Sequence, residues 1–124
     1  MRTPIQQAAQ NGHVEVVKIL LEAGVQVDPH MDSYDIEMPS PLWLAAQGGH
    51  VELVELLIRK GAYVNFSVHP SKRLPIHAAT EDGHTETVHL LIINGADIDA
   101  REEDGWSPLA IAANQNHIGV VNLL

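Results

Sequence analysis

Histidine is the residue type that first raises the question of chemistry in this sequence. Eight histidines occur among 124 residues, and four of them follow a Gly or an Asn at regular intervals: His13, His50, His84 and His117. A neutral imidazole is a common metal ligand, so such a series could indicate a metal site. Side chains that stand one interval apart along a stacked chain, however, do not converge on one ion. The regular register accounts for these histidines, and we expect no metal there.

The remaining candidate ligands and nucleophiles give no clearer sign of chemistry. His84 and His89, with Glu86 between them, are five residues apart, which places the two histidines on different faces of a helix. Cysteine is absent, which excludes disulfides, thiolate metal sites and a Cys nucleophile. The carboxylates show no recurring acid–base pairing, and the sequence has no nucleophile elbow or phosphate-binding loop. We therefore predict no catalytic residue, no cofactor and no enzyme activity.

The regular histidines belong to a longer pattern that the chain repeats four times. The copies are TPIQQAAQNGHVEVVKILL, SPLWLAAQGGHVELVELLI, LPIHAATEDGHTETVHLLI and SPLAIAANQNHIGVVNLL, which begin at Thr3, Ser40, Leu74 and Ser107. Aligned on their prolines, they are 37, 34 and 33 residues apart. A unit of this size cannot bury its apolar face alone, whereas stacked units can. The repetition therefore predicts a solenoid of similar units.

Each copy predicts two short helices. Thr3, Ser40 and Ser107 each precede a proline, and a hydroxyl at this position caps a helix whose first residue is proline. Residues that tolerate left-handed backbone should end the first helix: Gly12, Gly49, Gly83 and Asn116. The second helix carries an apolar face and should end at Gly24, Gly61 and Gly95, before the short extended segments VQVD, AYVN and ADID. Alanine pairs in the first helix allow neighbouring helices to approach closely.

The chain resembles the ankyrin-repeat family, through TP-I and SPL-LAA, G-H-VE-V--LL--GA-VN and DGWSPLAIAA. The resemblance covers essentially the whole chain. It implies an all-α solenoid of stacked antiparallel helix pairs joined by β-hairpin-like fingers. We expect one domain over residues 1–124, with repeats at about 1–28, 29–65, 66–99 and 100–124 and a lengthened finger at 28–40. It also implies a concave surface of fingertips and first helices that binds partner proteins.

The chain departs from the family pattern at several positions. The full TPLH motif is absent, because Gln6, Trp43 and Ala110 replace its His and Leu74 replaces its Thr. The hydroxyl–imidazole contact typical of the motif is therefore expected in no repeat, and the third copy should start its first helix less firmly. Neither end shows a polar capping repeat, so we expect a piece of a longer array.

Charge and hydropathy restrict the partners. The formal net charge is -9, and the few Lys and Arg residues are scattered, so nucleic acid is not expected as a partner. No apolar run approaches the roughly 18 residues that a membrane span requires, and no secretory leader is visible. We expect an intracellular protein, cytoplasmic or nuclear, that is monomeric as a fragment. A partner protein should be neutral or basic around the contact.

The resemblance implies that the partner-facing positions are the fingertips and the ends of the first helices. In this sequence they are Lys72, Arg73, Arg101, Glu103, Asp104 and Trp106, with Gln10, Asn11, Gln47, Glu81, Asp82, Asn114 and Gln115. Trp106 is the first candidate, because tryptophan is favoured at the energetic centre of interfaces. The alternative is that it folds over its own hairpin. We expect Trp43 to pack against a neighbouring finger.

The long acidic loop from Asp28 to Pro39 has two interpretations. It can be a solvated, lengthened finger, as insertions in loops often are. It can also be an acidic contact anchored by Tyr34, Met31 and Met38, because aromatic residues and Met are enriched at interfaces.

Asn65 is a candidate modification site. NFS matches a glycosylation sequon, and the residue is similar to asparagines that asparaginyl hydroxylases modify in ankyrin repeats. The alternative is a turn-stabilising Asn whose side chain bonds nearby backbone.

Three functions fit this sequence. The first is a non-catalytic protein–protein interaction module. The second is a regulatory or targeting segment of a larger enzyme or channel. The third is a structural array that stacks on its own copies through uncapped ends, which predicts self-association of the fragment.

Overall fold

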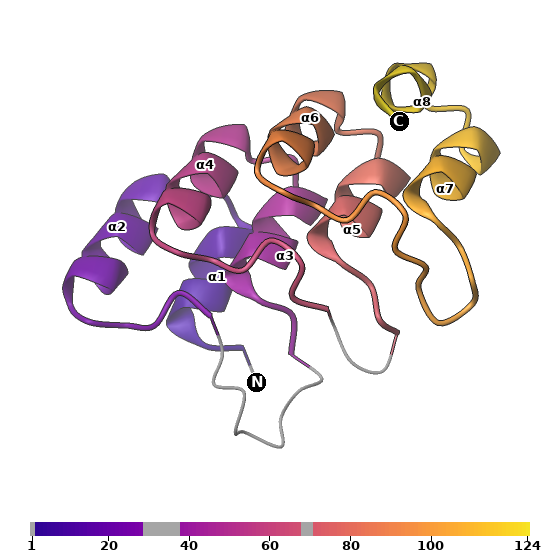
Figure 1. Cartoon of the computed structure of the whole chain (residues 1–124). Coiled ribbons are helices and arrows are strands. Elements are labelled where there is room, and N and C mark those ends of the chain that lie inside the picture. Colours follow the sequence, from indigo (N-terminus) through magenta and orange to yellow (C-terminus); the bar gives the residue numbers. More distant parts are fainter. Residues whose placement is uncertain (1, 29–37, 68–70) are drawn as a thin grey trace.

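The computed structural model describes residues 2–28, 38–67 and 71–124, and these form four antiparallel helix pairs (Figure 1). The helices are α1 (Pro4–Gln10), α2 (Val14–Glu22), α3 (Pro41–Gln47), α4 (Val51–Arg59), α5 (Pro75–Glu81), α6 (Thr85–Ile93), α7 (Pro108–Asn114) and α8 (Ile118–Leu123). The four predicted helix pairs are therefore confirmed, and the described part of the chain is all-α.

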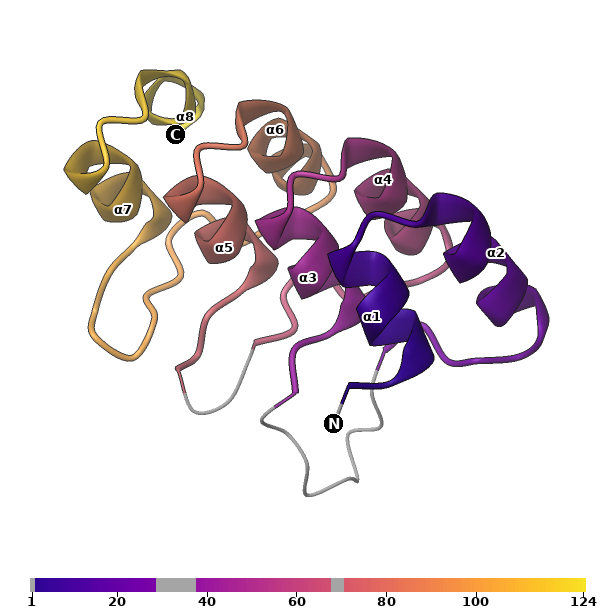
Figure 2. The ribbon, with the colours of Figure 1, turned by 180° about the vertical axis from the view of Figure 1, so that it is seen from behind.

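The helix pairs stack in two layers. The first helices α1, α3, α5 and α7 pack in that order, and so do the second helices α2, α4, α6 and α8. The segments that join one pair to the next, which we call fingers, extend from the same side of the stack (Figures 1 and 2). The first helix pair, α1 and α2, and the last, α7 and α8, lie at opposite ends of the row (Figure 1). We call the surface formed by the fingers and the first helices the finger–helix face.

Hydroxyl caps start three of the four first helices, as predicted. The side-chain oxygens of Thr3, Ser40 and Ser107 accept hydrogen bonds from the backbone N–H groups three residues later, at 3.3, 3.1 and 3.2 Å. Leu74 precedes α5 and has no acceptor in its side chain, so the hydroxyl cap is missing there. The helix nevertheless has the same seven-residue length as α1.

The turns between the helices of each pair adopt the predicted left-handed backbone. Gly12, Gly49 and Gly83 have φ angles of 71°, 69° and 71°, and Asn116 follows with 60°. Asparagine is the residue other than glycine that best tolerates this conformation, so the fourth turn keeps the geometry of the others.

The core lies between the two layers and depends on small residues in the first helices. Ala9, Ala45 and Ala46 are fully buried, which lets adjacent first helices approach closely, as expected. Val16 occupies the position of the fully buried Leu53 of the second repeat, but it is 45% exposed, because among the described residues no helix pair packs on that side of α2.

The third finger closes as a hairpin does, because the Glu102 N–H donates to the Trp106 carbonyl at 3.1 Å. Among the described residues no strand is present, and the segments VQVD, AYVN and ADID end in bends or turns. Side chains also join neighbouring fingers, as when the Asp28 carboxylate accepts from the Tyr63 N–H at 2.9 Å.

Candidate functional site

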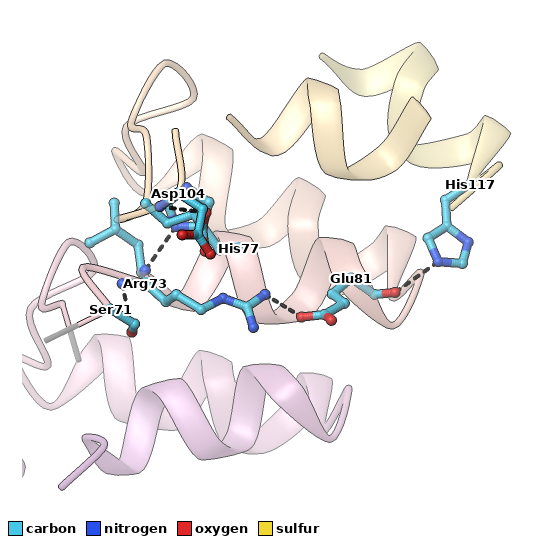
Figure 3. Close-up of polar contacts among 8 residues, drawn as sticks. Ser71, Arg73, His77, Glu81, Asp104 and His117 are labelled. Atoms are coloured by element: carbon cyan, nitrogen blue, oxygen red, sulfur yellow. Dashed lines mark hydrogen bonds and ion pairs between the residues drawn. The ribbon is translucent and has the colours of Figure 1, made fainter. Parts of the chain in front are cut away.

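Two positions recur on the finger–helix face, one two residues before each repeat proline and one six residues after it. In the first repeat Arg2 donates to the side chain of Gln10, and in the third Arg73 forms an ion pair with Glu81 (Figure 3). In the fourth repeat Trp106 occupies the position of the arginines. The fold therefore presents Trp106 on the surface that carries these polar pairs.

A shallow pocket of about 200 Å³ lies between the third and fourth repeats on this face. It is lined by Arg73, Glu81, Glu102, Asp104, Trp106, Ile111, Asn114 and Gln115. Six residues that were singled out from the sequence meet here, and they come from two fingers and two first helices. Glu102 and Ile111 were not singled out: Glu102 lies in the same fingertip as the candidates Arg101 and Glu103, and Ile111 is an apolar residue within a first helix.

The pocket combines an exposed indole with an excess of negative charge. Trp106 is 41% exposed. Three carboxylates, from Glu81, Glu102 and Asp104, face one guanidinium, from Arg73, and that guanidinium is paired with Glu81. The Glu102 carboxylate accepts from the Asp104 N–H at 3.1 Å, and no ion pair within the described residues involves either side chain. An unneutralised pair of carboxylates beside an aromatic face suits a cationic group.

Glu81 connects this pocket with the repeat stack. Its side chain binds Arg73, and its backbone carbonyl accepts from His117 Nε2 at 2.9 Å (Figure 3). The third finger is bonded to the second, because the Glu103 N–H donates to the Ser71 carbonyl at 2.7 Å. Hydrogen bonds therefore join the third and fourth repeats, whose residues line the pocket.

The remaining candidates lie outside the pocket. Lys72 is exposed at a turn with a φ angle of 59°, and Arg101 donates to the Gly105 carbonyl of its own finger at 3.3 Å. Gln47 and Asp82 are exposed at the ends of α3 and α5. Glu103 is exposed in the third finger. Tyr34 and most of the acidic loop lie outside the described residues.

His77 joins the start of α5 to the third finger through two hydrogen bonds that the sequence pattern did not predict. Its Nδ1 accepts from the Leu74 N–H at 2.9 Å, and its Nε2–H donates to the Ala100 carbonyl in the next finger at 2.8 Å. The ring is fully buried, and this burial lowers its pKa against the opposing effect of the Ala100 hydrogen bond. A neutral ring with its hydrogen on Nε2 satisfies both contacts.

Gln6 makes the same two contacts in the first repeat. Its Oε1 accepts from the Thr3 N–H at 2.7 Å, and its Nε2 donates to the Pro39 carbonyl at 3.0 Å. The expectation that the family's imidazole contact is lost with the TPLH motif therefore holds for the hydroxyl only. The amide of Gln6 and the imidazole of His77 accept from a backbone N–H instead. The two side chains can replace each other because each offers both an acceptor and a donor, and this shared property could have been seen in the sequence. Trp43, at the same position, is partly buried and packs against the core.

Asn65 joins two neighbouring fingers. Its Oδ1 accepts from the Asp97 N–H at 2.9 Å, and its Nδ2 donates to the Gly95 carbonyl at 3.1 Å. Both halves of the amide are therefore used in the stack, as in the turn-stabilising interpretation. Whether Asn65 is modified stays a prediction.

Three of the regular histidines have a clear structural use. The Nε2–H groups of His50, His84 and His117 each donate to a backbone carbonyl at the end of the first helix of the previous repeat, at 3.1, 2.9 and 2.9 Å. In residues 2–28, 38–67 and 71–124, no three His, Asp or Glu side chains gather in a group that could hold a metal ion. His30 and His69 lie outside these ranges.

The stacked helix pairs define a helix-pair repeat protein. The family model described as ankyrin repeats (3 copies) matches residues 1–68 and 42–124. The chain therefore belongs to the ankyrin-repeat family, as its motifs indicated. No curated protein matches the sequence. Ankyrin repeats are generally protein–protein interaction modules and are typically non-catalytic.

The longest described helices have nine residues, and none of those helices has the length and apolarity needed to cross a membrane.

Proposed function

We propose that the chain is a non-catalytic interaction module that binds a partner protein through the finger–helix face, centred on the pocket beside Trp106. The observation that carries this proposal is the exposed indole next to two carboxylates that no cation neutralises within the described residues. Tryptophan surrounded by polar residues is the usual make-up of an energetic hot spot in an interface. A scaffold that is already ordered loses little entropy on binding.

The chemistry of the pocket favours a basic side chain from the partner. A Lys or Arg could lie over the Trp106 ring while Glu102 and Asp104 neutralise its charge, a combination in which cation–π and ionic attraction add. Asn114, the last residue of α7, and Gln115, its C-cap, supply amide groups for backbone contacts. The other candidates, Gln47, Lys72, Asp82, Arg101 and Glu103, would form the polar rim. An intracellular location, cytoplasmic or nuclear, belongs to the same proposal.

Affinity capture from a lysate of the source cells tests this proposal with a variant designed to keep the fold. The variant carries Trp106→Ala with Arg73→Glu and Glu81→Lys. The two charge changes exchange the members of an ion pair, so their mutual attraction is retained while the surface pattern reverses. A protein that binds the wild-type chain through this face should be lost from the variant.

The control makes comparable changes on the second helices, away from the finger–helix face, with Ile93→Ala, Arg59→Glu and Glu55→Lys. Ile93 of α6 is 66% exposed, and Arg59 and Glu55 are exposed residues of α4. The control should retain every protein that the wild type retains. Equal capture by the finger–helix variant and the wild type would refute the assignment of this face, provided circular dichroism shows that both are folded.

A further inference from the structure

Adjacent repeats are joined by a contact with two different sides. One side is a histidine just before the second helix of a repeat. The other side is a backbone carbonyl at the end of the first helix of the repeat before it. His50, His84 and His117 make this contact with the carbonyls of Gln10, Gln47 and Glu81. The interface therefore has a direction along the stack, because each repeat offers a carbonyl on one face and an imidazole on the other.

The carbonyl side also requires glycine. A Cβ atom added to Gly12, Gly49 or Gly83 would lie 2.6, 2.5 or 2.7 Å from Nδ1 of the histidine in the next repeat. At such distances the ring must leave its place and give up its hydrogen bond. The glycine turn and the histidine are thus two complementary parts of one contact.

The outer face of α1 and α2 carries the imidazole side without its counterpart. His13 is exposed, and its imidazole, unlike those of His50, His84 and His117, makes no hydrogen bond within the described residues. Beside it, Ile19 is 63% exposed and Val16 45% exposed. Their counterparts in the second repeat, Leu56 and Leu53, are 3% and 0% exposed, because the preceding repeat covers them. We call the surface of His13, Val16, Ile19 and Leu20 the α2 end face.

The opposite end of the stack lacks the matching turn. Its apolar surface resembles the internal interfaces, since Leu109 is 47% exposed where Ile5, the residue at the same position in the first repeat, is 5% exposed. The turn, however, contains Asn116 with a φ angle of 60° in place of glycine. Its Cβ occupies the space that a histidine ring of a further repeat would need. A second copy stacked head to tail would bring His13 against Asn116.

We propose that the α2 end face is a docking surface for a helix-pair repeat whose turn contains glycine, and that Asn116 prevents a second copy of this chain from filling that place. The occupant presents a glycine turn and a free carbonyl at the end of its first helix, the surface that each of the first three repeats presents to its successor. The α2 end face continues the series of interfaces between repeats, because it is the fourth instance of a surface that is covered three times within the described part of the chain.

Sedimentation velocity on the full chain tests the proposal, with its own C-terminal repeat converted into the probe. Asn116→Gly supplies the glycine turn, and this variant should self-associate at least about tenfold more tightly than the wild type, which corresponds to about 1.4 kcal/mol. Asn116→Asp keeps a Cβ atom and the tolerance for left-handed backbone, and should behave as the wild type does.

A second substitution shows which surface is used. Adding Ile19→Asp to Asn116→Gly should abolish the association, whereas adding Ile93→Asp should not, because Ile93 is equally exposed, at 66%, but lies at the end of α6 within the stack. Association of Asn116→Gly no tighter than that of the wild type would overturn the proposal. So would association that is insensitive to Ile19→Asp, because another surface would then be responsible. Circular dichroism of each variant establishes that it is folded.

Discussion

Two buried polar side chains, Gln6 and His77, hold the starts of their first helices to the next finger. Each accepts from the N–H of the residue before the repeat proline and donates to a backbone carbonyl in the following finger. Both side chains are at most 4% exposed, so each contact replaces hydrogen bonds to water that folding removes. The two residues are chemically different but equivalent in this place.

His77→Gln is therefore expected to keep the stability of the wild type within about 1 kcal/mol at pH 7.5, whereas His77→Ala loses about 3 kcal/mol because two buried backbone groups lose their partners. Urea denaturation followed by circular dichroism gives both values. Equal losses in the two variants would show that the ring matters for its shape and not for its hydrogen bonds.

The same pair of proteins separates the acid response of His77 from that of the other histidines. The folded state lowers the pKa of His77, mainly by burial, so the unfolded chain binds more protons once the pH falls below about 6.5. The wild type should lose stability as the pH falls through this range, and His77→Gln should lose less. A constant difference between the two from pH 7.5 to 5 would contradict this.

Asp28 occupies in the first repeat the place that Asn65 occupies in the second. Its Oδ2 accepts from the Tyr63 N–H, but its buried Oδ1 has no partner among the described residues. In Asn65 the corresponding position is Nδ2, which donates to the Gly95 carbonyl. Burial raises the pKa of Asp28, against the effect of the Tyr63 hydrogen bond. The charged carboxylate is therefore poorly matched to this place.

Asp28→Asn should stabilise the fold by about 1 kcal/mol at neutral pH, because the new amide can donate to the Gly61 carbonyl as Asn65 does to Gly95. For a carboxyl with a raised folded pKa, stability is lost as the pH rises above the unfolded value of about 3.9. The gain should therefore be smaller at pH 4 than at pH 7, as thermal unfolding at the two pH values can show. A destabilised variant at pH 7 would refute this account of Asp28.

At the scale of the helices, the glycine turns serve two purposes that substitutions can separate. Gly49 and Gly61 both have positive φ angles, of 69° and 96°. A Cβ atom at Gly49 would lie 2.5 Å from the His84 ring, whereas one at Gly61 would meet nothing within 4 Å. Gly49 thus allows both the left-handed backbone and the close approach of His84 from the next repeat, whereas Gly61 allows only the left-handed backbone.

Gly61→Ala should cost about 1 kcal/mol, the expense of a left-handed conformation for alanine. Gly49→Ala should cost at least about 2 kcal/mol, because the His84 ring must also leave its bond to Gln47. Urea denaturation of both variants measures the difference. If the two losses are the same, the contact between His84 and the glycine turn adds nothing to the stack.

The sequence was sufficient to predict the elements, because their signals are local. A hydroxyl before the proline begins three of the first helices, and a glycine eight residues after the proline follows the end of three of them. The partners of the polar side chains could not be predicted in the same way. His77 reaches a carbonyl 23 residues away and His50 one that is 40 residues away, so these contacts depend on how the repeats stack. The pocket beside Trp106 could be predicted only by analogy with the family.

At the scale of the whole molecule, the repeat stack separates the residues that build the scaffold from those that vary on its surface. The core is made of Leu, Val, Ile and Ala at positions that recur in each helix pair, together with a few buried polar side chains. The finger–helix face differs from one repeat to the next, with arginine in the first and third and Trp106 in the fourth at one equivalent position. This division is what a protein-binding module requires.

The measurement that tests the central claim most directly is fluorescence titration of a Trp43→Phe chain with the captured partner. Trp106 is then the only indole, and it is 41% exposed in the free protein. Burial by the partner should shift its emission to the blue, and added salt should weaken the affinity because the pocket carries excess carboxylates. The control is Trp106→Phe, in which Trp43 reports and its emission should stay constant. Unchanged Trp106 emission at saturating partner would place binding on another surface and contradict the account.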